Sequence, residues 1–184
     1  MNTVDIELCV TKRYNMTKVN RGKDFEQCVK DGFCKLPQTS VIRLLDPQAG
    51  FSGVSNICDY IVYHYPHQFC IECKCTYGHT LSINSNDTKR KFGAISNTQW
   101  YGLCEQSAIH GVVAGYMIWF IDHDITVFVS AEDLVQFKAL GKKSINVNDL
   151  GKELDCISIR GTKRRVLFDY DFTEFIERIN KQYE

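Results

Sequence analysis

The chain has 184 residues, of which 44% are hydrophobic and 24% are charged. These are ordinary values for a globular protein and exclude a disordered, collagenous or coiled-coil chain, so we expect a single domain over residues 1–184. The 22 Lys and Arg residues balance the 22 Asp and Glu residues. Taken alone, a net charge of zero argues against a nucleic-acid-binding protein, because such domains usually carry excess positive charge.

The first regular element is expected after an N-terminal arm. Residues 1–19 predict a flexible basic arm, and Asn20 is a suitable N-cap. Apolar side chains then recur at helical spacing, which predicts a helix of about 12–14 residues. These apolar residues are Phe25, Cys28, Val29 and Phe33. A short apolar strand is predicted over 41–45, and a Gly-containing polar loop over 46–55.

Two segments in the middle of the chain are typical of a β-hairpin. Residues 59–65 and 68–77 are rich in β-branched and aromatic side chains, and Pro66-His67 separates them as a turn. Residues 78–95 are polar and predict a connection without regular structure.

The second half of the chain predicts a helix, two strands, a helix, a strand and a final helix. Ser96 is the expected cap of a helix that runs to about His110, and Ser130 with Asp133 resembles a capping box for a helix to Leu140. The predicted strands and the start of the last helix are 112–121, 125–129, 156–159 and Phe172. This order predicts an α/β fold with helices on both sides of a mixed β-sheet.

The nine cysteines form an odd set that cannot all pair. No apolar run reaches about 18 residues and no apolar N-terminal segment occurs, so we expect a cytoplasmic protein with reduced thiols and no membrane partner. Cys70, Cys73 and Cys75 with His79 nearby raise the alternative of a zinc site, but no second CxxC pair occurs. We therefore interpret these cysteines as small core residues.

One strand combines an apolar pattern with two charges. Alternation places Glu72 and Lys74 on one face of the segment 69–75. The opposite face carries apolar side chains only, namely Phe69, Ile71, Cys73 and Cys75. Buried charges are costly unless they are paired or bind a metal ion, so this strand is the first candidate for a functional site.

A turn at Pro66-His67 predicts that Asp59 lies opposite Lys74 and that Ile61 lies opposite Glu72. Asp59, Glu72 and Lys74 then converge on one surface. Carboxylates are hard ligands for Mg²⁺, and a lysine beside them can orient or deprotonate water, so the set suits a divalent-metal phosphodiesterase. From spacing alone, an Asp–Lys ion pair across the strands with Glu72 at a sheet edge is an equal alternative.

The ordered motifs resemble a known nuclease superfamily. Asp59, a hairpin and Glu72-Cys73-Lys74 resemble the PD-(D/E)xK motif, with Cys58 in the place of its proline. Within that superfamily, the chain from about residue 20 onward is similar to RecU-type Holliday junction resolvases. The segments that carry this resemblance are Asn20-Arg21-Gly22, Glu26, 55–60, 71–74, Gln99 and 141–145. The resemblance implies a restriction-endonuclease-like core in the order αβββαβ, with C-terminal additions.

The resemblance also implies a role for each matching residue. Asp59 and Glu72 would bind Mg²⁺ together with the main-chain carbonyl of Cys73, and Mn²⁺ would substitute for Mg²⁺. Lys74 would activate water.

Two further side chains are implied to take part. Glu26 would complete the metal environment, and Gln99 would contact the lysine or the attacked phosphate. The alternative interpretations are a solvated helix acid for Glu26 and a surface amide for Gln99.

Basic residues gather in segments that could contact phosphates. Those expected to bind DNA are Arg13, Lys18, Arg21, Lys23, Lys89, Arg90, Lys91, Lys142, Lys143, Lys163, Arg164 and Arg165. Solvated loops are the alternative interpretation. Acids such as Asp122 and Asp124 lie elsewhere in the chain, so the zero net charge is expected to be a sum over segregated faces.

These features predict a Mg²⁺-dependent, structure-selective endonuclease that resolves four-way DNA junctions in recombination and repair, without an organic cofactor. Symmetric cleavage of a junction implies a homodimer. The resemblance also implies that the stalk by which such resolvases enter a junction is shortened here to 46–55. A restriction-like or mismatch-directed duplex nuclease and a non-catalytic DNA-binding protein of the same fold remain the alternatives.

Overall fold

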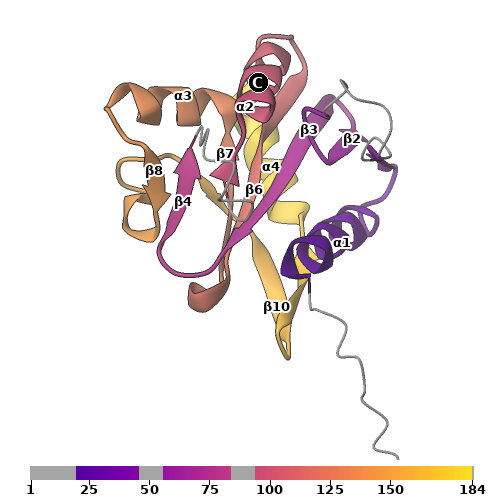
Figure 1. The fold of residues 1–184 in the computed structure, drawn as a ribbon. Coiled ribbons are helices and arrows are strands. Elements are labelled where there is room, and N and C mark those ends of the chain that lie inside the picture. The colour runs from indigo at the N-terminus through magenta and orange to yellow at the C-terminus, as the bar shows by residue number, and fades with distance from the viewer. Residues whose placement is uncertain (1–19, 46–55, 84–93, 184) are drawn as a thin grey trace, which may run out of the picture.

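The structure is a computed structural model that describes residues 20–45, 56–83 and 94–183. Its centre is a six-stranded sheet (Figure 1). In spatial order the strands are β1 (Ser40–Arg43), β2 (Tyr60–His64), β3 (His67–Thr76), β6 (Val112–Phe120), β7 (Ile125–Ser130) and β9 (Ile157–Ser158). β3 and β6 are parallel and the other neighbours are antiparallel, so the sheet is mixed.

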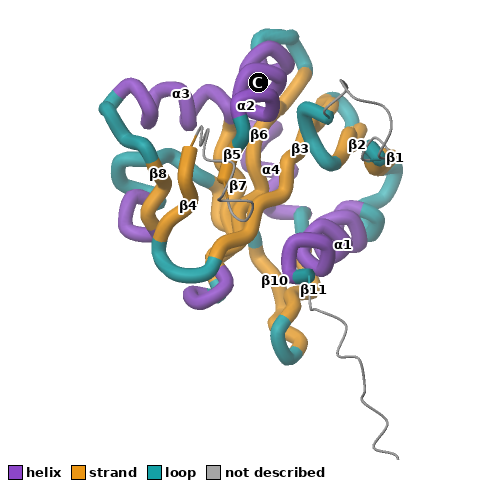
Figure 2. Tube along the Cα trace, viewed as in Figure 1, coloured by secondary structure: helices purple, strands orange, loops and turns teal. Residues whose placement is uncertain are grey.

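Helices cover both faces of this sheet (Figure 2). They are α1 (Arg21–Phe33), α2 (Asn97–Ser107), α3 (Ala131–Ala139) and α4 (Thr173–Tyr183). α1 and α4 pack on one face, and α2 and α3 pack on the other. The predicted α/β class is confirmed, and the order α1-β1-β2-β3-α2-β6 contains the predicted core. None of the helices within these ranges is long and apolar enough to span a membrane.

The two faces of the central sheet have separate cores. Under α1 and α4 the core is aromatic: Phe33 stacks on Phe172 with ring centroids 3.9 Å apart, and Phe128 meets Phe175 edge-on at 5.0 Å. Under α2 and α3 the core is mainly aliphatic and centres on side chains such as Leu103. Each strand between the helices therefore contributes alternate residues to two different environments.

The helix starts agree with the predicted caps. Asn20 caps α1, which has 13 residues, and the Ser130 side chain accepts a hydrogen bond from the N–H of Asp133 at the start of α3. α2 ends at Ser107, three residues before the predicted end at His110. Two 3₁₀ segments connect strands, η1 (Ile121–His123) and η2 (Val147–Asp149).

Two small β-structures were not predicted. The first is a three-stranded sheet in the order β5 (Ala94–Ile95), β4 (Thr80–Ile83) and β8 (Ser144–Asn146), so the prediction of no regular structure over 78–95 is wrong. Its strands have two to four residues, which is too short to show alternation. The second is the hairpin of β10 (Arg160–Arg164) and β11 (Leu167–Asp171). All five residues of β10 are exposed, so it lacks an apolar face.

The β2–β3 hairpin turns one residue earlier than predicted, at Tyr65-Pro66. Ile61 consequently lies opposite Cys70, and the predicted pairing of Ile61 with Glu72 is wrong. The error is two residues in register. Since side chains alternate with a period of two, this shift leaves every side chain of β3 on its predicted face.

Candidate active site

β3 carries two charged side chains on the face that is covered by α2. The Nζ of Lys74 lies 2.8 Å from Oε1 of Glu72, and Glu72 is only 3% exposed. On the opposite face, Cys73 and Cys75 are buried in the aromatic core. The predicted alternation is confirmed, and the two charges meet inside a strand that is otherwise buried.

The surroundings of Glu72 disfavour its charged form. Burial raises the pKa of Glu72 to about 8, and the negative charges of Asp59 and Glu26 contribute to the rise, while Lys74 opposes it. A carboxyl group in such a place is stabilised in its charged form by an additional cation. A metal ion beside Glu72 would therefore lower the pKa of this carboxyl group and stabilise its charged form.

Asp59 directly precedes β2 and lies beside the middle of β3. Its N–H donates to the carbonyl of Ile71 (3.0 Å), and its Oδ2 accepts a hydrogen bond from the N–H of Cys73 (2.8 Å). Asp59 thus contacts the main chain on both sides of Glu72, and the predicted position opposite Lys74 is wrong because the hairpin turns earlier. The predicted convergence of the two acids nevertheless holds.

The carbonyl group of Cys73 has a direction that follows from the same hydrogen bond. In a β-strand, the N–H and the C=O of one residue point to the same side of the strand. Because the N–H of Cys73 points to Asp59, its carbonyl oxygen faces the same edge, where the pairing with β2 ends at Tyr60. Two carboxylates and one carbonyl therefore border the same part of β3.

Gln99 joins α2 to this site. Ser96 and Gln99 form a capping box, in which the Oε1 of Gln99 accepts from the N–H of Ser96 (3.2 Å). The Nε2 of Gln99 donates to Oε1 of Glu72 (2.5 Å). The resemblance implied a contact with Lys74 or a phosphate, and the observed partner is Glu72 instead. Gln99 is therefore a constrained amide at the site, and the interpretation as a surface amide is wrong.

Glu26 is held by β1 and β2. The Nη2 of Arg43 lies 2.6 Å from Oε2 of Glu26, and the Tyr60 hydroxyl donates to the main-chain carbonyl of Glu26 (3.2 Å). The hydrogen bond with Glu26 raises the pKa of Arg43. Glu26 therefore pairs with Arg43 in this structure, and its part in a metal environment stays a prediction. Arg43 was not predicted as a site residue, and its only signal in the sequence is a basic residue at the end of a short apolar strand.

A close contact between α2 and the segment before β2 sets the spacing of the site. A Cβ atom at Gly102 would lie 2.3 Å from Cγ2 of Ile57, which is closer than real Cβ contacts. Ile57 precedes Asp59 by two residues, and Gly102 lies one turn after Gln99 on α2. The absence of a side chain at Gly102 therefore lets α2 approach the Asp59 segment.

The donors at this site fit Mg²⁺ or Mn²⁺. The candidate ligands are the carboxylates of Asp59 and Glu72 and the carbonyl of Cys73, and all are hard oxygen donors. Mg²⁺ commonly binds one or two carboxylates and keeps water or substrate oxygens as its other ligands. Within the described residues, no three His, Cys, Asp or Glu side chains form a metal-binding group, so Glu26 does not join Asp59 and Glu72 in such a group.

The cysteines of β3 do not form a zinc site. Cys70 is buried in the core under α2, whereas Cys73 and Cys75 are buried in the core under α1 and α4. Opposite faces of a sheet cannot supply ligands to one ion. The interpretation of these residues as core cysteines is confirmed, and all three are free thiols.

The basic residues predicted to bind DNA occupy three places in the described ranges: the first turn of α1, the segment before β8, and the turn of the β10–β11 hairpin. They are Arg21, Lys23, Lys142, Lys143, Lys163, Arg164 and Arg165. The other predicted residues and the shortened stalk lie outside the described residues: Arg13, Lys18, Lys89, Arg90, Lys91 and 46–55. Binding of DNA by these residues stays a prediction.

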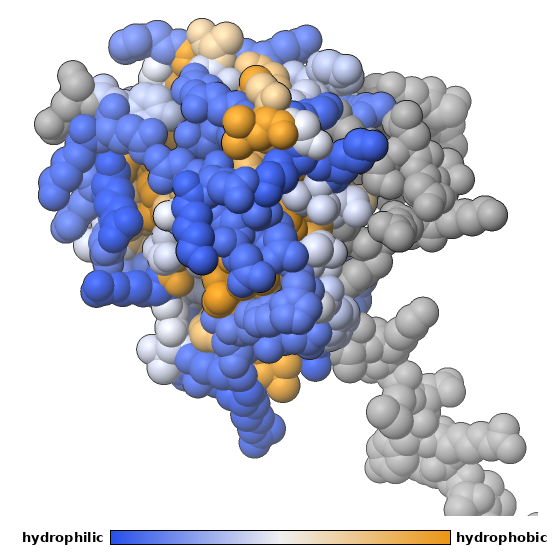
Figure 3. All heavy atoms as spheres, turned by 90° about the vertical axis from the view of Figure 1, so that its left-hand side faces the viewer, coloured by the Kyte–Doolittle hydropathy of each residue, from blue (hydrophilic) through white to orange (hydrophobic). Residues whose placement is uncertain are grey.

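Acids accompany several of these bases. Lys163 lies 2.5 Å from Asp124, and Lys142 lies 2.6 Å from Glu153. The side of the molecule with α3 and β8 is largely hydrophilic, with small separate apolar areas (Figure 3). The expected segregation of acids from bases is therefore wrong at these places, and the neutral net charge arises in part from local ion pairs.

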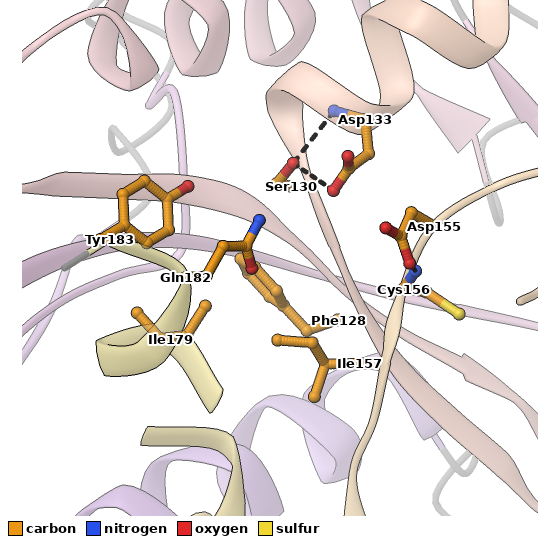
Figure 4. A pocket seen from close by; sticks show the side chains of 9 residues that line it. All are labelled: Phe128, Ser130, Asp133, Asp155, Cys156, Ile157, Ile179, Gln182 and Tyr183. Carbon is orange, nitrogen blue, oxygen red and sulfur yellow. Dashed lines mark hydrogen bonds between the residues drawn. The ribbon is translucent and has the colours of Figure 1, made fainter. Parts of the chain in front are cut away.

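A pocket between β7, β9 and α4 does not match the predicted chemistry (Figure 4). Its volume is about 70 Å³, well below the roughly 300 Å³ or more of ligand-binding pockets. Ser130 and Asp133, which line it, bond to each other (2.6 Å) at the start of α3. Their polar atoms are thus explained by helix capping, and the group around Glu72 remains the candidate active site.

Comparisons with known proteins found little sequence similarity. No family model matches the chain, and no curated protein matches it. Among solved structures, the chain is similar to Hjc, a Holliday junction resolvase from the archaeal hyperthermophile Archaeoglobus fulgidus. The identity is 18%, the match covers 69% of this chain and 89% of that chain, and the TM-score is 0.45.

Proposed function

We propose that this chain is a Mg²⁺-dependent endonuclease that hydrolyses phosphodiester bonds in DNA. The observation that carries the proposal is the meeting of Asp59, Glu72, Lys74 and Gln99 at one edge of β3, through contacts of 2.5–2.8 Å to Glu72 and to the adjoining main chain. Asp59, Glu72 and the carbonyl of Cys73 are the proposed metal ligands. Bound Mg²⁺ supplies Lewis-acid polarisation of a phosphate oxygen and a more acidic water.

The protein side chains have separate tasks in this proposal. Lys74 presents an ammonium group beside the buried carboxylate, where it holds the attacking water and offsets the charge that develops on the phosphate. Gln99 fixes the carboxylate of Glu72 by donating to the same oxygen that Lys74 contacts. Glu26 adds negative charge near the ligands and is oriented by Arg43.

The proposed substrate is a four-way DNA junction, and the proposed active form is a homodimer. The resemblance of the sequence motifs to RecU-type resolvases supports the substrate. Basic residues on α1, before β8 and on the β10–β11 hairpin lie outside the site and are available to contact phosphates after exchange of their ion pairs.

The test is cleavage of a synthetic four-way junction in Mg²⁺ by the wild type and by Asp59→Asn. We expect Asp59→Asn to cleave about 10³-fold more slowly, an effect comparable to the loss of a principal electrostatic contact. Asp31→Asn is the matched control, because Asp31 bonds to Gln27 on the exposed surface of α1. Equal rates for Asp59→Asn and the wild type would contradict the proposal.

The substrate class is tested in the same assay with three DNAs. Faster cleavage of the junction than of mismatched or plain duplex supports junction resolution. Preference for mismatched or plain duplex supports a duplex nuclease of the same superfamily. Junction binding without cleavage in either Mg²⁺ or Mn²⁺ supports a non-catalytic DNA-binding protein.

A further inference from the structure

Tyr116 on β6 is a fully buried side chain whose hydroxyl group has no part in the proposed chemistry. It is 1% exposed and belongs to the core under α2. Its hydroxyl oxygen is buried and forms no hydrogen bond within the part of the chain that the structure describes. The hydroxyl of a buried tyrosine normally has a partner. The packing of the ring therefore does not explain why this residue carries a hydroxyl.

Two other tyrosines are buried to the same degree, and both have partners for their hydroxyl groups. The hydroxyl of Tyr60 donates to the main-chain carbonyl of Glu26 (3.2 Å). The hydroxyl of Tyr170 bonds to that of Thr126 (2.8 Å). Both rings lie in the core under α1 and α4, whereas Tyr116 lies on the side of the candidate active site. A phenylalanine at position 116 would fill the same space without the cost of burying an unpaired hydroxyl.

The register of the central sheet places Tyr116 beside Glu72. The two residues are Cα partners in the parallel pairing of β3 with β6, and neighbouring strands lie about 4.8 Å apart. Both side chains point to the face covered by α2, since Tyr116 belongs to the core there and Glu72 bonds to Gln99 of α2. Asp59 borders β3 from the opposite edge, next to β2. Tyr116 is thus the neighbour of Glu72 on the side away from the other carboxylate.

The known contacts of Glu72 leave a task for a further donor. Nζ of Lys74 (2.8 Å) and Nε2 of Gln99 (2.5 Å) both contact the same atom, Oε1 of Glu72. Two donors at one oxygen fix that oxygen more strongly than they fix the rotation of the carboxylate plane, which decides where Oε2 points. A tyrosine hydroxyl is a hydrogen-bond donor at neutral pH, so a donor on the β6 side can limit this rotation.

We propose that Tyr116 is a positioning residue of the candidate metal site, whose hydroxyl donates to a buried water that in turn donates to the carboxylate of Glu72. Such a water has two polar partners, which is the minimum that buried waters usually have, and a bridge of this kind is nearly as favourable as a direct hydrogen bond. Tyr116 contacts neither metal nor substrate and acts through the orientation of Glu72. The inference rests on the proposed function, because it concerns one of the proposed metal ligands.

The test is Mn²⁺ binding by Tyr116→Phe, which removes one oxygen atom and keeps the ring. Binding to the metal-free full chain is measured by electron paramagnetic resonance without DNA. We expect about 10-fold weaker binding than in the wild type, as for the loss of one hydrogen bond to a charged group. Binding within two-fold of the wild type would overturn the inference. An idle hydroxyl would give that result together with a higher urea midpoint, because the variant buries no unpaired polar atom.

Tyr170→Phe is the matched control. It removes the hydroxyl of an equally buried tyrosine on the other face of the sheet and leaves Thr126 without this partner. We expect a lower urea midpoint in the metal-free chain and unchanged Mn²⁺ binding. An equal loss of Mn²⁺ binding in Tyr170→Phe and Tyr116→Phe would overturn the inference, because the effect would then not depend on the position beside Glu72.

Asp59→Asn separates the failure of this inference from the failure of the proposed function. We expect this variant to bind Mn²⁺ at least 10-fold more weakly than the wild type. If it does so while Tyr116→Phe binds normally, the inference alone is wrong. If Asp59→Asn binds normally, the proposed metal site is wrong and the inference falls with it. Absence of DNA cleavage by a wild type that shows the expected Mn²⁺ pattern overturns the nuclease proposal alone.

Discussion

The two faces of β3 are buried to a similar depth but differ in what burial does to stability. On one face Phe69 and Ile71 are fully buried among aromatic and aliphatic side chains, and their removal from water stabilises the fold. On the other face Glu72 is 3% exposed and Lys74 lies against it. Burial of this ion pair opposes folding unless every polar atom finds a partner. The apolar face of β3 therefore stabilises the fold, whereas the buried charges on the other face are best explained by a functional role.

The largest expected effect concerns the charged face. Lys74→Ala removes the ammonium group that would hold water and offset charge, so we expect junction cleavage to fall by about 10²–10⁴-fold. The measurement is the single-turnover rate in Mg²⁺. Cys75→Ala, one position further along β3 on the apolar face, is the control and should keep the wild-type rate per folded molecule. Similar losses in both variants would show that the two faces do not differ in function.

The apolar face should dominate stability. Phe69→Ala deletes a fully buried ring that contacts Phe33 and Phe175, and we expect the free energy of unfolding to fall by about 3–5 kcal/mol. Urea unfolding followed by circular dichroism measures this change. Tyr63→Ala removes a half-exposed ring from the neighbouring strand and should cost about 0.5 kcal/mol or less. A small effect of Phe69→Ala would contradict the role of this core.

The buried carboxyl of the charged face should make stability depend on pH. Because the folded state keeps a proton on Glu72 up to about pH 8 and the unfolded state releases it near pH 4.5, the free energy of unfolding decreases as pH rises through this window. In EDTA we expect a decrease of roughly 2–4 kcal/mol from this group. Glu72→Gln should lack this component, and Mg²⁺ should diminish it in the wild type. Parallel pH curves for the two proteins would refute the assignment.

A smaller effect separates the two tasks of Gln99. Gln99→Ala removes the hydrogen bond to Glu72, so we expect about 10-fold slower cleavage, as for loss of one bond to a charged group. Ser96→Ala removes the hydroxyl cap of α2 and its bond to Oε1 of Gln99 (3.0 Å) but keeps the bond from the N–H of Ser96 to that oxygen, so it should cost about 1 kcal/mol of stability and slow the rate per folded molecule less than Gln99→Ala does. Equal rates in the two variants would mean that Gln99 acts only as a cap.

The sequence predicted those features that depend on local pattern. Alternation in 69–75 placed Glu72 and Lys74 on one face, and Asn20 and Ser130 predicted two helix starts. The predicted register of the hairpin was wrong because the position of a turn beside Pro66 is decided by the packing of both strands. The face assignment survived that error, since a shift of two residues preserves the alternation.

The remaining features depend on contacts between distant segments. β4 pairs with β8, and neither strand is long enough to show a period. The exposed β10 contains mostly charged or small residues and is a strand because β11 pairs with it. The contact of Gln99 with Glu72 and that of Arg43 with Glu26 join residues on different elements. A local sequence pattern cannot predict contacts between residues that are so far apart in the chain.

The close approach at Gly102 makes the dimensions of the candidate site adjustable by a single side chain. Any atom added there must displace Ile57 or α2, and these two segments carry Asp59 and Gln99 respectively. A series of increasing side-chain volume at this position would therefore widen the gap between a proposed metal ligand and the residue that orients the other ligand, without altering either. Substitutions at position 102 thus vary which ionic radius the site fits best, while the reacting groups stay the same.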